Sequence, residues 1–103
     1  MSNFVKVARV EDIPEGEMKS VVAEHQNILL VHVADGIFAL ADECTHDYAP
    51  LSTGRVKGNQ VMCSRHGARF DVKSGAVLAP PAIVDVDTFA VKVEDGDIYV
   101  AID

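Results

Sequence analysis

Four potential metal ligands lie in two short stretches of this 103-residue chain. Cys44 and His46 stand in CTHDYAP with one residue between them, and Cys63 and His66 stand in CSRHGA with two residues between them. These are both cysteines of the chain and two of its four histidines. Thiolates are soft ligands and neutral imidazoles are borderline ones, so the set suits an iron–sulfur cluster or zinc. The spacing therefore predicts one metal site that is built from two mixed loops.

Several other interpretations of these residues stay open at this point. Cys44 and Cys63 could be buried thiols without a metal. Structural zinc sites usually pair their cysteines and histidines in separate C-x₂₋₄-C and H-x₃₋₅-H motifs, but a zinc-binding interaction module is an alternative. A nucleophilic Cys63 activated by His66 is another, although the sequence shows no orienting partner or oxyanion hole. A disulfide is disfavoured in a reducing compartment.

Composition limits the class of protein. The chain has nine Lys and Arg residues against sixteen Asp and Glu residues, a formal charge of −7, which argues against nucleic acid as a partner. This charge favours association with basic patches on other proteins, and its alternative role is solubility alone. No window approaches the run of about 18 apolar residues that spans a bilayer. Because the N-terminal residues show no secretory signal pattern, we expect a cytoplasmic protein.

The elements that must position the two loops are β-strands. The segment from Phe4 to Val10 alternates apolar and polar residues, as a half-buried strand does. Asp-Gly pairs at Asp35-Gly36 and Asp95-Gly96 stand between apolar runs and predict hairpins. One helical turn is possible within residues 10–15. The pattern predicts an all-β fold, an antiparallel sandwich or barrel in a single domain of residues 1–103.

A loop-rich segment lies between the predicted hairpins. Residues 43–81 contain three of the four prolines and four of the seven glycines, with short strands expected in NQVMC and RFDV. We predict a cluster-binding subdomain of about residues 43–82, with each ligand loop at the tip of a hairpin. Positive φ angles are expected at its glycines, Gly54, Gly58, Gly67 and Gly75.

The two motifs resemble those of the Rieske [2Fe-2S] family. The likeness covers Cys44-Thr45-His46 and Cys63-Ser64-Arg65-His66-Gly67, and it continues through GARFDVKSGAVLAPPA, which resembles the family's third, proline-containing loop. It implies the Rieske fold and one [2Fe-2S] cluster, with the cysteines on one iron and the histidines on the other. In the oxidised state two ferric ions, two sulfides and two thiolates sum to zero charge. Adding an electron is therefore easier than with four thiolates, and such clusters have potentials of roughly −150 to +300 mV.

Departures from the family's high-potential members are equally informative. Those members carry an extra cysteine in each loop. At the positions that match these cysteines in the resemblance, this chain has Ala49 and Arg65. The disulfide that those extra cysteines form between the loops therefore cannot form here. The hydroxyl donors of those members correspond here to Ala68 and Phe70, so we expect a potential near the low end of the range.

The pattern is similar to soluble Rieske-type ferredoxins. The resemblance implies a monomeric electron carrier, not an enzyme, with no catalytic residues of its own. Its partners would be a flavin-containing, NAD(P)H-dependent ferredoxin reductase and the terminal oxygenase of an aromatic-ring-hydroxylating dioxygenase system. The alternative within the family is a small Rieske-fold subunit of a larger oxidoreductase such as nitrite reductase.

The remaining candidate residues have two interpretations each. Residues beside the ligands could form the docking surface or could be solvated loop residues: Asp47, Tyr48, Pro50 and Arg65. Pro80-Pro81 could limit water access to the cluster or could simply stiffen a loop. His25 and His32 fall in β-patterned stretches with no cysteine nearby, and we interpret them as structural or surface residues.

Overall fold

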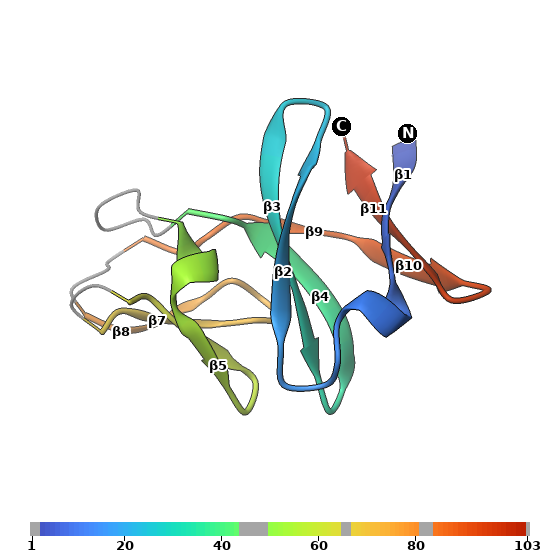
Figure 1. Cartoon of the computed structure of the whole chain (residues 1–103). Helices are drawn as coiled ribbons and strands as arrows, with labels where there is room; N and C mark the ends of the chain where they lie inside the picture. Colours follow the sequence, from blue (N-terminus) through green and yellow to red (C-terminus); the bar gives the residue numbers. More distant parts are fainter. Residues whose placement is uncertain (1–2, 44–49, 65–66, 81–83, 103) are drawn as a thin grey trace.

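A computed structural model describes residues 3–43, 50–64, 67–80 and 84–102, and these residues form an all-β structure (Figure 1). Single 3-10 turns follow the first strand, as η1 (Val10–Asp12), and precede the fifth, as η2 (Leu51–Thr53). In the described ranges no helix has the length and apolar character needed to cross a membrane. The strands are β1 (Asn3–Arg9), β2 (Met18–Ala23), β3 (Gln26–Val33), β4 (Gly36–Ala41), β5 (Arg55–Lys57), β6 (Gln60–Met62), β7 (Arg69–Asp71), β8 (Val77–Ala79), β9 (Thr88–Phe89), β10 (Val91–Glu94) and β11 (Asp97–Ile102).

The strands pair into three antiparallel sheets. Sheet A has the order β1-β11-β10, sheet B the order β2-β3-β4-β9, and sheet C the order β5-β6-β7-β8. Sheet B stands between the other two in Figure 1, and β1 and β11 bring the two ends of the described chain close together. The predicted all-β antiparallel fold is thus confirmed.

Strand β3 is the centre of the core because both of its faces are covered. Leu29 and Val31 pack with residues of sheet C such as Val61 and Phe70, whereas Leu30, on the opposite face, joins the cluster that contains sheet A. A strand that is buried on both faces needs apolar residues at successive positions rather than alternating ones. This requirement explains the uninterrupted run Ile28–Val31, each residue of which has no exposed surface.

Tight hairpin turns join the strands of sheets A and B. Val33 pairs with Gly36 and Glu94 pairs with Asp97, so both predicted Asp-Gly hairpins are confirmed. The β2–β3 hairpin is different, because its turn residues Glu24 and His25 have φ angles of 48° and 70° without a glycine. Non-glycine residues occupy this left-handed region uncommonly, which is why the sequence pattern did not indicate this turn.

One strand boundary differs from the sequence pattern. The alternating stretch that begins at Phe89 and leads into the Asp95-Gly96 hairpin has the pattern of one strand, but it is divided at Ala90. Phe89 pairs with Ala39 of sheet B, whereas Val91 pairs with Val100 of sheet A. The chain therefore passes from one sheet to the other within two residues, a change that leaves the apolar pattern uninterrupted.

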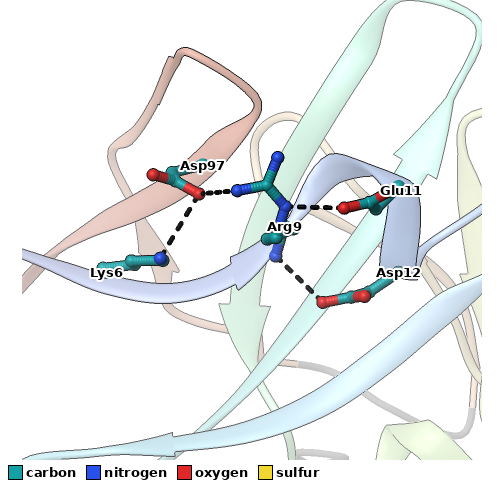
Figure 2. A network of polar contacts seen from close by, with 5 residues as sticks. All are labelled: Lys6, Arg9, Glu11, Asp12 and Asp97. Atoms are coloured by element: carbon teal, nitrogen blue, oxygen red, sulfur yellow. Dashed lines mark hydrogen bonds and ion pairs between the residues drawn. The ribbon is translucent and has the colours of Figure 1, made fainter.

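A charged network ties the start of the chain to the last hairpin (Figure 2). The guanidinium of Arg9 donates to Glu11 at 2.7 Å and to Asp97 at 2.8 Å, and the ammonium of Lys6 lies 3.4 Å from the same Asp97 oxygen. The hydrogen bond to Glu11 and the charge of Asp97 raise the pKa of Arg9. Asp12 accepts a hydrogen bond from the backbone N–H of Arg9 at 3.0 Å. These pairs hold the β1–η1 corner in place. Because they are exposed, they contribute little to the free energy of folding.

Candidate metal centre

The second ligand loop is the tip of the β6–β7 hairpin, as predicted. Met62 pairs with Arg69 at the end of the ladder, and the N–H of Cys63 donates to the carbonyl of Ala68 at 2.8 Å across the loop. Gly67 has a φ of 77°, which a residue with a side chain adopts only with strain. Cys63 is 2 % exposed, so its thiol is shielded from bulk water. Hairpin geometry thus holds this cysteine in a buried position.

The first ligand loop is not a hairpin tip, contrary to expectation. It connects the end of β4 in sheet B to η2, which leads into sheet C. The N–H of Ala41 donates to the carbonyl of Asp87 at 2.8 Å, and the N–H of Gly54 closes η2 on the carbonyl of Leu51 at 2.9 Å. The loop therefore crosses between two sheets, and both of its stems are fixed by backbone hydrogen bonds.

The stems of the two ligand loops lie against each other. The hydroxyl oxygens of Thr53 and Ser64 are 2.9 Å apart. A Cβ atom on Gly54 would lie 1.8 Å from the carbonyl oxygen of Met62 and 3.2 Å from the backbone nitrogen of Ser64. Only a residue without a side chain permits so close an approach of two backbones. The fold therefore brings the start of sheet C directly beside the cysteine of the second loop.

The glycine prediction holds at three of its four positions. Gly58, Gly67 and Gly75 have positive φ angles, but Gly54 has a φ of −90°, a value open to any residue. Gly54 is required by the neighbouring backbone instead. Sequence alone does not separate a glycine needed for its φ angle from one needed for lack of volume.

The segment that resembles the third loop is anchored on both sides of its prolines. The carboxylate of Asp71 accepts hydrogen bonds from the N–H and the hydroxyl of Ser74, and the carboxylate of Asp85 accepts one from the N–H of Val77 at 2.9 Å. The N–H of Val86 also donates to the carbonyl of Gly75 at 2.9 Å. Pro80 is exposed. Its role in limiting water access stays a prediction.

Most of the predicted ligands lie outside the described residues. This holds for Cys44, His46 and His66, and equally for the predicted positions Asp47, Tyr48, Ala49, Arg65 and Pro81. The described residues nevertheless fit a [2Fe-2S] cluster. They place a buried thiol in one loop and fix the stems of the other loop beside it, as a group ligated from both loops requires. Among the described side chains there is no group of three His, Cys, Asp or Glu residues that could hold a metal ion elsewhere.

His25 and His32 have the structural or surface positions that were expected. The ring Nδ1–H of His32 donates to the carbonyl of Ile13 at 2.6 Å and so fastens the segment before β2 to β3. His25 occupies the β2–β3 turn and lines a cleft of about 510 Å³ together with Glu43 and Asp87.

Sequence reasoning missed one group near the site. Asp42 is 8 % exposed, and among the described residues it is the one charged side chain in the core. Its carboxylate binds Ser52 on the far side of the first ligand loop at 2.8 and 2.9 Å. The available signal in the sequence was a charged residue that directly follows an apolar strand and stands two positions before a predicted ligand.

Ala68 and Phe70 have no exposed surface, and neither side chain has a hydroxyl that could donate to a cluster. We expect a midpoint near the low end of the roughly −150 to +300 mV range. The variant Ala68→Ser should raise it, since a hydrogen bond to a charged group of about 1.5 kcal/mol corresponds to about 65 mV for one electron. Voltammetry on both proteins measures this change, with Ala8→Ser as a buried control in sheet A. A wild-type midpoint well above zero against hydrogen would contradict the argument.

The β framework and the two loops with their predicted ligands indicate an iron–sulfur electron-transfer domain, and comparison with known proteins agrees. The Rieske [2Fe-2S] domain family matches residues 3–90, and the chain belongs to this family. The cofactor expected from the sequence, one Rieske-type [2Fe-2S] cluster, is thereby confirmed.

Similar proteins are components of multicomponent oxygenase systems. The chain is 37% identical to the ferredoxin component of the naphthalene 1,2-dioxygenase/salicylate 5-hydroxylase systems of a Ralstonia species, over 90% of this chain and 89% of that protein. The ferredoxin of carbazole 1,9a-dioxygenase from Nocardioides aromaticivorans IC177 has 28% identity and a TM-score of 0.92, over 96% of this chain and 97% of that one. These relatives confirm the expected class, an electron-transfer protein of the Rieske ferredoxin type rather than an enzyme.

A third relative was solved together with a partner. It is a chain in the complex of reduced oxygenase and oxidized ferredoxin of carbazole 1,9a-dioxygenase. It has 32% identity and a TM-score of 0.90, covering 95% of this chain and 92% of that one. In that system a protein of this fold meets its oxygenase directly.

Proposed function

We propose that this chain carries single electrons from a flavin-containing, NAD(P)H-dependent ferredoxin reductase to the terminal oxygenase of an aromatic-ring-hydroxylating dioxygenase system. One observation carries the proposal: the chain matches the Ralstonia ferredoxin component at 37% identity over nearly the whole of both chains. The carbazole dioxygenase complex supports the oxygenase as a partner. We place the protein in the cytoplasm as a monomer that associates transiently with each partner.

We further propose the ligand set Cys44, His46, Cys63 and His66, within a cluster-binding subdomain of about residues 43–82 of the single domain 1–103. The cysteines would hold one iron and the histidines the other. A cluster of this kind supplies reversible one-electron chemistry. The role of the protein is to shield its thiolates from water, as Cys63 is shielded, and to fix the two loops relative to each other.

Exposed residues near the predicted cluster-binding loops fit short-lived docking. Leu78 and Val84 are exposed apolar residues on either side of the proline segment, with 50% and 57% of their surface accessible. Exposed carboxylates also lie beside the first loop, where Glu43 and Asp87 line the cleft. An apolar centre with a charged rim is typical of protein interfaces, and electron-transfer encounters are at the small end of their size range.

Two measurements test the proposed electron transfer. Anaerobic titration should deliver one electron per chain. The reduced protein should then be oxidised by the oxygenase component of the Ralstonia system in stopped-flow experiments, and its oxidised form should be reduced by the reductase component. A chain that accepts no electron, or that exchanges none with either component, would overturn the proposal.

Ionic strength should slow this electron transfer. The Debye length falls from about 30 Å at 0.01 M to about 3 Å at 1 M, so salt screens attraction between the acidic rim and a basic partner. The double variant Glu43→Lys, Asp87→Lys should lower the low-salt rate constant several-fold. Glu15→Lys, an exposed substitution at the opposite end of sheet B, is the control with the same kind of charge change. Rate constants that do not depend on salt would rule out electrostatic steering.

A further inference from the structure

The carboxylate of Asp42 accepts three hydrogen bonds, from hydroxyl and backbone donors of two serines. Its Oδ2 atom accepts hydrogen bonds from the hydroxyls of Ser20 at 2.7 Å and of Ser52 at 2.9 Å, and its Oδ1 atom accepts one from the N–H of Ser52 at 2.8 Å. The N–H of Asp42 donates to the carbonyl of Asn27 at 3.0 Å. A carboxylate in the core is stable only when its oxygens are satisfied in this way.

These contacts close the first ligand loop at its base. Asp42 directly follows β4 and precedes the loop, whereas Ser52 belongs to η2, on the far side of the loop. Ser20 lies on β2, the edge strand of sheet B that pairs with the buried strand β3. The carboxylate therefore joins both stems of the loop to the central sheet.

The same base is connected to the second ligand loop. Thr53 adjoins Ser52 on η2, and its hydroxyl contacts that of Ser64 at 2.9 Å. Ser64 follows Cys63, whose N–H closes the second loop on Ala68. Hydrogen bonds and one helical turn thus form a continuous path from sheet B through both loop stems.

We propose that Asp42 is a positioning residue that sets the separation of the two ligand loops, acting through Ser52 and the Thr53–Ser64 contact. The link to a cluster rests on the proposed function of the loops. Outer residues that orient ligands typically change metal affinity by about 10–100-fold when they are replaced. Asp42→Ala removes every acceptor at this point and leaves the serine donors without their partner.

The first test measures cluster retention in the holoprotein. We expect Asp42→Ala to accelerate the loss of visible absorbance in the presence of an iron chelator by about 10-fold or more. Asp42→Asn should restore much of the retention, because an amide oxygen still accepts from the N–H of Ser52. The control is Asp35→Ala, which removes a partnered carboxylate at the opposite end of sheet B, where Asp35 binds Lys73 and Asn59. Equal rates for Asp42→Ala and Asp35→Ala would overturn the proposal.

The second test does not depend on the cluster. Hydrogen exchange of the Cys63 amide reports on the second loop, which Asp42 does not touch in the described structure. We expect Asp42→Ala to speed this exchange by about 10-fold and Asp35→Ala to leave it unchanged. Thr53→Val should itself speed the exchange, and in that background Asp42→Ala should add little, since two steps on one path are not additive. Fully additive effects, or an unchanged Cys63 amide, would refute the coupling.

The outcomes separate this proposal from the proposed function. A wild-type protein without iron would overturn electron transfer, and the exchange of Cys63 would still decide whether Asp42 couples the loops. If Asp42→Ala does not fold, Ser52→Ala replaces it, because this variant removes the 2.9 Å hydroxyl contact and keeps the backbone donor. It should give a smaller acceleration in the same direction, and no acceleration would count against the proposal.

Discussion

Replacing Cys63 by serine is expected to abolish the cluster and leave a colourless protein. A serine hydroxyl is a hard and weakly acidic donor, whereas iron–sulfur clusters are held by thiolates. Cys63 directly follows β6 and is 2 % exposed. The chain has one other cysteine, Cys44, which is itself a predicted ligand, so no spare thiol can take the place of Cys63. Iron and acid-labile sulfide analysis of the purified variant, together with its visible spectrum, measures the loss directly.

Two controls show that this loss is specific to the thiolate. Met62→Leu alters the neighbouring position with little change of volume, a kind of swap that usually costs less than about 1.5 kcal/mol, and should keep the colour. His25→Asn removes a histidine that is not a predicted ligand and should keep it too, whereas His46→Asn or His66→Asn should not. Retention of colour and of two irons per chain in Cys63→Ser would break the ligand assignment.

The largest loss of stability is expected from Gly54→Ala. The new Cβ atom would lie 1.8 Å from the carbonyl oxygen of Met62, so the stems of the two ligand loops would be forced apart. Overpacking of this kind costs about 3 kcal/mol, which corresponds to a fall in the unfolding temperature of roughly 12–24 °C for a domain of this size. The variant should also hold less iron, because the displacement occurs between the loops.

Gly58→Ala is the matched control for this prediction. Gly58 has a φ of 58°, and nothing lies within 4 Å of its added Cβ, so alanine meets backbone strain there without a clash. A left-handed alanine costs about 1–2 kcal/mol, and the iron content should stay normal. Thermal unfolding followed by circular dichroism measures the loss of stability in both variants. Equal destabilisation with equal iron content would show that the packing of Gly54 is unimportant.

The hairpin framework could be predicted because its signals are local. Asp35-Gly36 and Asp95-Gly96 mark turns by their own chemistry, and the alternation from Phe4 onwards marks a strand. The division into three sheets could not be predicted in this way. It depends on partners distant in sequence, as when Phe89 pairs with sheet B and Val91 with sheet A.

The candidate site likewise has a part that local sequence signals predict and a part that depends on residues distant in sequence. The candidate ligands could be proposed from type and spacing, since Cys44, His46, Cys63 and His66 form a set with few chemical uses. The residues that support them could not. The buried carboxylate of Asp42 owes its place to Ser20 and Ser52, ten or more positions away, and the need for a glycine at position 54 comes from Met62 on another strand.

Metal and sulfide analysis of the purified wild-type protein, combined with electron paramagnetic resonance, tests the central claim most directly. The ligand set and the family predict two irons and two acid-labile sulfides per chain. They also predict a brown protein that is silent when oxidised and shows a rhombic signal after reduction. A colourless protein with one zinc per chain would contradict the account, because the same cysteines and histidines would then form a structural site with no electron to transfer.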